Sequence, residues 1–153
     1  MVILCDTRQQ AGKHKNIDSY LQKRGIPTAR TALYVGDYTI ANDQHIAVDT
    51  KQGVLELIMD MHQDHERFAA ECQRAKDAGI RLYILVEETL PGGRIDRWQS
   101  PTDRRGNPLT RTDMTAFRES LITMTAKYDV RFRFCDARST GKVLLELLTG
   151  GEV

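Results

Sequence analysis

The stretch that most constrains this chain is residues 34–52, YVGDYTIANDQHIAVDTKQ, which reads as two strands joined by a short turn. Asp37 follows a glycine at the start of the first strand, and Asp49 and Lys51 lie at the end of the second. Residues two apart in a strand share a face, so Asp49 and Lys51 point to one side while Thr50 points to the other. A single hairpin therefore brings two carboxylates and an ammonium together.

Helices and strands are predicted on both sides of this hairpin. Strands are expected at residues 2–4, 82–86 and 130–135, and helices at residues 16–24, 52–61, 66–78, 112–128 and 139–149. Asn16 and Thr112 are expected to cap their helices. The unbroken apolar run at 82–86 indicates a strand covered on both faces, and the alternation VRFRFC at 130–135 indicates a strand with a solvated face or an edge strand. This order predicts the α/β class.

Length, composition and cysteine usage limit the classes of protein to consider. With 153 residues, the chain is expected to form one domain, residues 1–153. No apolar run approaches the roughly 20 residues of a membrane span, and the N-terminus does not resemble a signal peptide, so no membrane partner is expected. Cys5, Cys72 and Cys135 lie in apolar patterns, which predicts buried, reduced thiols in a cytoplasmic protein. A net charge of +1 means that any nucleic-acid partner must be bound by local basic clusters.

Residues 91–111, PGGRIDRWQSPTDRRGNPLTR, interrupt the pattern as one long loop, with a possible helical turn near residues 95–98. This loop carries five arginines, Arg94, Arg97, Arg104, Arg105 and Arg111, against only two acids, Asp96 and Asp103. Long loops in compact domains are usually functional or disordered. Two interpretations stay open here: a basic surface that binds phosphates, or a solvated loop.

The acids of the hairpin predict a divalent-metal site. Carboxylates at the ends of neighbouring strands repel one another, and a bound cation removes that conflict. Oxygen ligands favour Mg²⁺ or Mn²⁺, and no Cys or His pair has the spacing of a zinc finger. Two acids with a lysine beside them suit phosphodiester hydrolysis, in which Lys51 orients the water or stabilises charge at phosphorus. The alternative is that Asp49 and Lys51 form an ordinary surface ion pair.

These motifs resemble a known family. VGDYTI followed by VDTK is similar to the GDY...ERK signature of the XPF-type, or ERCC4-domain, structure-specific endonucleases, a branch of the PD-(D/E)xK nucleases. The segments ILCDTRQ, KNIDSYLQKRGIPTARTALYVGDY, HERFAAECQRAKDAGIRLYILVEE and KYDVRFRFCDARSTGKVLLELL also resemble parts of that domain. The resemblance implies a restriction-endonuclease-like core, with a central mixed β-sheet flanked by helices on both faces.

The resemblance also implies roles for the residues of the hairpin. Asp37 and Asp49, with the carbonyl of Thr50, would be ligands of Mg²⁺ or Mn²⁺, and Lys51 would be the catalytic lysine.

Residues outside the hairpin complete the expected site. Asp6 and Arg8 match the first motif of the family and would support the metal site and the scissile phosphate. Arg67, Arg104 and Arg105 are the expected DNA-binding residues.

Four departures from the family pattern fall near the expected site. Asp49 replaces the usual glutamate, Thr50 replaces arginine, and Gln9 replaces the glutamate after the first-motif arginine. Leu55 stands where the family has an acid four positions after the lysine, and Glu56 follows it. A D-x-K version is common in the wider superfamily, so catalysis remains the expectation.

By this resemblance the chain is a metal-dependent DNA endonuclease that acts on branched or flapped duplex DNA in repair or recombination, in the cytoplasm of a bacterial or phage-infected cell. The family's helix-hairpin-helix and helicase modules do not fit in this chain. DNA affinity is therefore expected from the core, the basic loop, a homodimer, or a separate DNA-binding or helicase partner. The alternatives are a nuclease of other specificity, such as end trimming, a catalytically weak DNA-binding subunit, and a small-molecule α/β domain.

Overall fold

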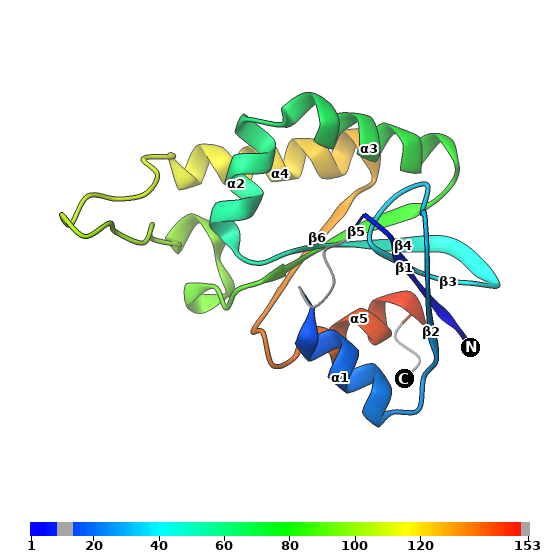
Figure 1. Ribbon diagram of the computed structural model, residues 1–153. Coiled ribbons are helices and arrows are strands. Elements are labelled where there is room, and N and C mark those ends of the chain that lie inside the picture. The colour runs from blue at the N-terminus through cyan, green and yellow to red at the C-terminus, as the bar shows by residue number, and fades with distance from the viewer. Residues whose placement is uncertain (9–13, 151–153) are drawn as a thin grey trace.

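The computed structural model describes residues 1–8 and 14–150, which form one six-stranded sheet with five α-helices (Figure 1). The strands are β1 (Ile3–Asp6), β2 (Thr28–Thr31), β3 (Tyr38–Ile40), β4 (Asp43–Lys51), β5 (Arg81–Glu87) and β6 (Arg131–Cys135). The helices are α1 (Lys15–Lys23), α2 (Val54–His62), α3 (His65–Asp77), α4 (Met114–Tyr128) and α5 (Thr140–Leu148). The predicted helices, strands and hairpin are all present, with small differences at their ends.

The sheet is mixed, and its strand order is β2-β1-β3-β4-β5-β6. The pairs β1–β3 and β3–β4 are antiparallel, whereas β1–β2, β4–β5 and β5–β6 are parallel. β6 is an edge strand, which confirms the interpretation of its alternating sequence: Arg131 and Arg133 are exposed, and Phe132 is half-buried. The hairpin β3–β4 lies in the middle of the sheet, so its acidic side chains emerge from the buried centre of the molecule.

Helices cover both faces of the sheet, as expected for this fold class. Figure 1 shows α2, α3 and α4 on one face and α1 with α5 on the other. The side chains of β5 alternate between the two layers, because Leu82 and Ile84 join the core under α2–α4 while Leu85 joins the core against α1 and α5. Each such side chain contributes about 1.5–3 kcal/mol when fully buried. A two-sided core explains why residues 82–86 are uniformly apolar.

Neither Asn16 nor Thr112 caps its helix, so both expected caps are wrong. Helix α4 is capped by Asp113 and not by Thr112, because the Asp113 carboxylate accepts hydrogen bonds from two backbone N–H groups of the first turn, at 3.0 and 3.2 Å. Asn16 lies inside α1, and its side-chain amide donates to the Ala137 carbonyl at 3.0 Å. Asn16 therefore ties α1 to the segment before α5 and does not cap its own helix.

The cysteines are free thiols. Cys5 and Cys72 are buried, as predicted, whereas Cys135 is only half-buried. Burial raises the pKa of Cys5 to about 11 and the pKa of Cys72 to about 12, so both thiols are protonated and unreactive at neutral pH. No helix in the described part of the chain has the length and apolar character needed to cross a bilayer.

Helices α1 and α5 pack closely at Gly141, where a Cβ atom would lie 2.5 Å from the Cβ of Tyr20. In an exposed helix, replacing glycine by alanine stabilises the protein by about 1 kcal/mol. Here we expect the opposite: Gly141→Ala should lower the free energy of unfolding by about 1–3 kcal/mol, because the two backbones must move apart. Urea unfolding measures this change, with Lys142→Ala, an exposed neighbour on α5, as the matched control. A Gly141→Ala variant as stable as the wild type would contradict the close packing.

The long loop is anchored at its start and exposed at its tip. Its first half forms two short 3-10 helices, Pro91–Gly93 and Ile95–Arg97, and Trp98 is buried with its indole N–H donating to Glu88. Residues 102 and 108 then pair as an isolated β-bridge around a turn. This segment projects from the body of the molecule (Figure 1). The root of the loop is therefore packed against the body, and both interpretations stay open for its exposed tip.

Candidate active site

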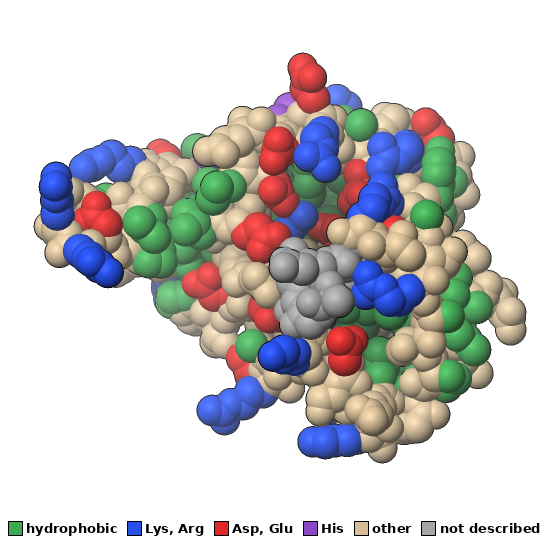
Figure 2. All heavy atoms as spheres, viewed as in Figure 1, with side chains coloured by type: hydrophobic (Ala, Val, Ile, Leu, Met, Phe, Trp, Pro, Cys, Tyr) green, Lys and Arg blue, Asp and Glu red, His purple; other side chains and the backbone are tan. Residues whose placement is uncertain are grey.

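The structure gathers six of the predicted residues around one cavity of about 490 Å³. They are Asp6, Arg8, Asp37, Asp49, Lys51 and Arg67. The cavity opens where β4 ends, beside α3. Figure 2 shows acidic side chains gathered in the middle of this face, with Lys and Arg side chains beside them.

The position of Asp37 depends on the glycine before it. Gly36 has a φ of +74°, and a Cβ atom there would lie 3.1 Å from the Val48 carbonyl oxygen, so the backbone fits closely only without a side chain. The Asp37 N–H donates to that same carbonyl at 2.8 Å. The Asp37 Oδ2 atom accepts from the Thr50 N–H at 2.8 Å and from the Thr50 hydroxyl at 2.9 Å. Asp37 is thereby fixed across the hairpin.

Asp49 and Lys51 lie on one face of β4, as the strand period predicts. The Lys51 Nζ atom lies 2.7 Å from Asp49 Oδ2 and 2.6 Å from Asp60 Oδ2. Asp49 Oδ2 is buried, and the Lys51 ammonium is the cation beside it among the described residues. Asp49 therefore holds an oxygen that is removed from water and faces a positive charge.

Burial and neighbouring charges shift the pKa values of Asp49 and Lys51. Burial, and then the charge of Asp37, raise the pKa of the Asp49 carboxyl well above its ordinary value. Burial alone would lower the pKa of Lys51, but the Asp49 and Asp60 carboxylates outweigh it and raise that pKa above its usual value. Lys51 is therefore held as an ammonium between the carboxyl groups of Asp49 and Asp60.

Asp6 and Arg8 form the other wall of the cavity. Arg8 Nε donates to Asp6 Oδ2 at 2.8 Å, and the second Asp6 oxygen accepts from the Leu33 N–H at 3.0 Å. The Asp6 N–H also donates to the Asp37 carbonyl at 2.8 Å. Each oxygen of Asp6 therefore accepts a hydrogen bond, while most of the Arg8 side chain is exposed at the rim.

Four further charged residues of the cavity were not predicted, one of which is Asp64 just before α3. Asp60 on α2, and Glu71 and Arg74 on α3, line it together with the predicted set. Burial, and then Asp37, raise the pKa of Glu71. A signal for Glu71 was available, because a carboxylate three residues after the buried Phe68 shares its helical face.

Asp60 also bears on a departure from the family pattern. Asp60 lies nine positions after Lys51, whereas the acid of the family motif lies four positions after the lysine. The motif therefore does not predict that Asp60 belongs to the site. Glu56, the nearest acid by position, instead accepts from the Gln52 N–H at 2.9 Å. Gln9, another departure, lies outside the described residues.

The donor set fits a hard divalent cation that is only partly held by protein. Among the described residues, no three carboxylate, imidazole or thiolate side chains are already arranged as a metal site. Asp37 and Asp49 supply two carboxylates that line the cavity, and one oxygen of Asp49 is buried. Magnesium is commonly bound by one or two carboxylates, with water and substrate phosphate completing its shell. The Asp37 and Asp49 carboxylates therefore fit Mg²⁺ or Mn²⁺, whereas Thr50, the third predicted ligand, is not among the residues that line the cavity.

Arg104 and Arg105 do not join this cavity. They lie on the projecting loop, where the Asp103 carboxylate accepts from the Arg105 N–H at 2.8 Å and holds the turn. Figure 2 shows Lys and Arg side chains gathered at the tip of this projection. The structure therefore separates the predicted DNA-binding arginines into a cavity residue, Arg67, and a loop pair.

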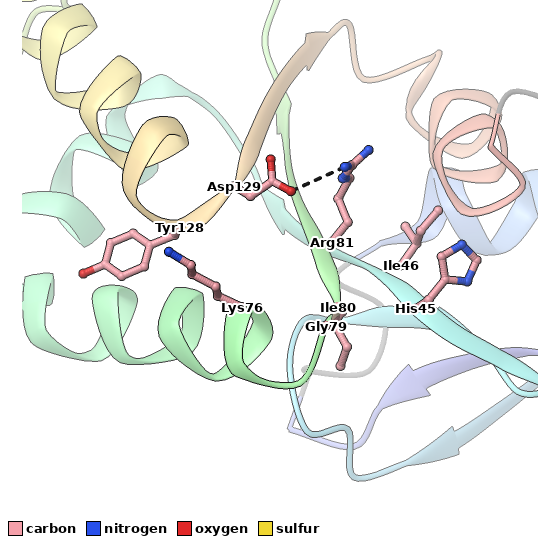
Figure 3. A pocket seen from close by; sticks show the side chains of 8 residues that line it. All are labelled: His45, Ile46, Lys76, Gly79, Ile80, Arg81, Tyr128 and Asp129. Atoms are coloured by element: carbon pink, nitrogen blue, oxygen red, sulfur yellow. Dashed lines mark hydrogen bonds and ion pairs between the residues drawn. The ribbon is translucent and has the colours of Figure 1, made fainter.

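A second hollow, of about 370 Å³, lies at the opposite end of the parallel strands (Figure 3). Its charged groups are already engaged: Arg81 pairs with Asp129 at 3.4 Å, and Lys76 donates to the Lys127 carbonyl at 2.7 Å. Asp129 is its only carboxylate among the lining residues that the structure describes. The cavity at the end of β4, which is lined by several carboxylates, is therefore the better candidate for the active site.

Comparisons with known proteins agree with this geometry. The family model for the ERCC4 domain matches residues 5–147. No curated protein matches the sequence significantly. Two solved structures are similar over 97% of this chain at 18% identity: XPF from Aeropyrum pernix, with a TM-score of 0.66, and XPF from Aeropyrum pernix in complex with DNA, with a TM-score of 0.67. This chain spans 63% of the length of each. The likeness confirms the expected fold class.

Proposed function

This chain belongs to the ERCC4-domain family, and from that membership we propose that it is a metal-dependent DNA endonuclease that hydrolyses phosphodiester bonds at branched or flapped duplexes. The observation that carries the proposal is the convergence of Asp37, Asp49 and Lys51 in one open, charged cavity. The solved XPF structure in complex with DNA supports DNA as the substrate. Repair or recombination is the corresponding process.

In this proposal the side chains of the cavity have different roles in the cleavage of one phosphodiester bond. Asp37 and Asp49 would hold the Mg²⁺ or Mn²⁺ ion, which would polarise the phosphoryl oxygen and lower the pKa of the attacking water. Lys51 orients that water and stabilises the negative charge that develops at phosphorus. Arg8 and Arg67 hold the DNA backbone at the rim.

Asp60 has a positioning role in the same scheme. A cation held by Asp49 would weaken the attraction of Lys51 to that carboxylate. The Asp60 carboxylate, at 2.6 Å, keeps the ammonium in place. Lys51 then points into the cavity in both states, which preorganises it for the charge at phosphorus.

Two alternative functions are disfavoured by the geometry. A DNA-binding subunit without turnover would not need Asp37, Asp49 and Lys51 together in one cavity. A small-molecule α/β domain is expected to have a mainly apolar pocket with few polar groups, whereas this cavity is lined chiefly by charged residues. End trimming uses the same chemistry on a different DNA shape and is separated by the choice of substrate.

The test is cleavage of labelled linear duplex, flap and four-way-junction DNA by the purified protein with Mg²⁺, Mn²⁺ or EDTA. We expect cleavage of flap or junction DNA with either metal and none in EDTA. Shortening of linear duplex from its ends would favour end trimming. Absence of metal-dependent cleavage on all substrates would overturn the proposal.

The loop arginines provide a separate prediction about DNA affinity. Arg104→Ala with Arg105→Ala is expected to weaken DNA binding and to reduce the slope of log K against log salt by up to about 2, roughly 1 for each phosphate that the loop no longer neutralises. Fluorescence anisotropy across a salt series measures the slope. Arg94→Ala is the matched control in the same loop, because Arg94 is already paired with Asp96 at 2.5 Å. An unchanged slope in the double variant would mean that the tip is only solvated.

Self-association is part of the proposal. Among residues 1–8 and 14–150, no strand pairs with the outer side of the edge strand β6, which supports pairing with a second copy. A homodimer, or a separate DNA-binding or helicase partner, would extend the DNA contact beyond the cavity and the loop.

A further inference from the structure

Tyr34 occupies an unusual place for an aromatic side chain. It is 61% exposed, the largest value among the exposed large hydrophobic side chains of the described residues, although Leu33 and Val35 on either side are buried. Tyr34 belongs to the segment that leads into Gly36 and Asp37. A large ring is therefore presented to solvent next to the cavity.

The backbone that carries Tyr34 is fixed by groups of the site itself. The Leu33 N–H donates to Asp6 Oδ1 at 3.0 Å, and the Leu33 carbonyl accepts from Arg8 Nη2 at 2.7 Å. On the other side, Gly36 packs against the Val48 backbone. Tyr34 cannot move into the core without breaking these contacts, so its exposure is built into the site.

Arg74 places the ring relative to the cavity. Its guanidinium carbon lies 6.0 Å from the centroid of the Tyr34 ring, within reach of a cation–π contact. Arg74 also lines the cavity that holds Asp37 and Asp49. The Tyr34 ring is thereby tied to the rim, within the reach of DNA whose phosphate lies in the cavity.

We propose that Tyr34 stacks on an unpaired base next to the scissile phosphate and so selects DNA with a single-stranded arm. This inference rests on the proposed function. A paired base inside a duplex is covered on both faces by its neighbours, whereas an unpaired base offers a face to an aromatic ring. A fixed, exposed tyrosine beside the acids therefore favours branched over continuous duplex DNA.

The test uses flap DNA with 2-aminopurine at the first unpaired position, bound to the full chain with Ca²⁺ in place of Mg²⁺. Stacking on Tyr34 should quench the fluorescence. Tyr34→Ala should lose the quench and bind the flap about 5- to 150-fold more weakly, the range for removal of one base–aromatic stack, with affinity for linear duplex within about 2-fold of the wild type. Tyr34→Phe keeps the ring and should keep both properties. Tyr34→Leu keeps apolar bulk and should lose the quench, and Ile122→Ala, an exposed apolar residue of α4, is the matched control.

The outcomes of this test distinguish failure of the stacking role from failure of the proposed nuclease function. If the wild type cleaves flap DNA but Tyr34→Ala keeps the quench and the flap affinity, the stacking role is wrong and the nuclease stands. Equal weakening on flap and duplex would also overturn it, because Tyr34 would then contact the backbone of both. If the wild type neither binds nor cleaves flap DNA, the proposed function and this inference both fail.

Discussion

Replacing Lys51 by alanine is expected to slow DNA cleavage about 10²- to 10³-fold, the loss that follows removal of one group that stabilises transition-state charge. Asp49→Asn is expected to lose at least as much, because a neutral amide is a poorer ligand for Mg²⁺ than a carboxylate. Single-turnover rates on flap DNA measure both losses. DNA affinity with Ca²⁺ should change much less for Lys51→Ala, because the exposed arginines at the rim remain.

Two controls keep that result interpretable. Glu56→Gln changes the acid nearest to the family position but should leave the rate unchanged, because Glu56 accepts from the Gln52 N–H outside the cavity. Lys51→Met removes the charge but keeps side-chain bulk beside Phe68, so it tests whether poorer packing explains the defect. Undiminished cleavage by both Asp49→Asn and Lys51→Ala would show that the assigned site is wrong even if the protein is a nuclease.

The elements of the fold were predictable because each carries a local signal. The apolar run at residues 82–86 could only be a covered strand, and the alternation at 130–135 correctly indicated the edge. The helix caps were less predictable. Thr112 and Asp113 are both good capping residues, and which of them caps α4 depends on the path of the preceding loop. The Asn16 side chain donates a hydrogen bond to Ala137 instead. No local sequence pattern reveals a contact between residues so far apart.

The site was predictable as far as strand geometry and the family motif reach. The period of β4 placed Asp49 and Lys51 on one face, and the motif added Asp6 and Arg8. Asp60 and Glu71 came from helices whose packing angle decides which polar side chain meets the cavity. The sequence shows that Glu71 lies beside a buried stripe, but only the tertiary contact shows that this stripe adjoins Asp37.

The crowded carboxylates predict a metal-free protein that becomes less stable as the pH rises. The folded pKa values of Asp49 and Glu71 are raised, whereas in the unfolded chain these groups titrate near their ordinary values of about 4. Above about pH 4 the folded state therefore holds more protons than the unfolded state, so the free energy of unfolding falls as the pH rises through the raised values. Urea unfolding in EDTA between about pH 5 and 8 measures the slope.

Mg²⁺ should reverse this loss. A cation bound only by the folded state adds about 2.7 kcal/mol at 100 times its dissociation constant, and the gain should grow with pH because the ligands must be ionised. Asp49→Asn should flatten the slope in EDTA and abolish the gain from Mg²⁺. Glu71→Gln should flatten the slope but keep the gain, because Glu71 adds to the repulsion without being one of the proposed ligands. Wild-type protein that shows the same pH slope as Asp49→Asn, with no gain from Mg²⁺, would mean that the acids of the cavity are not poised for a cation.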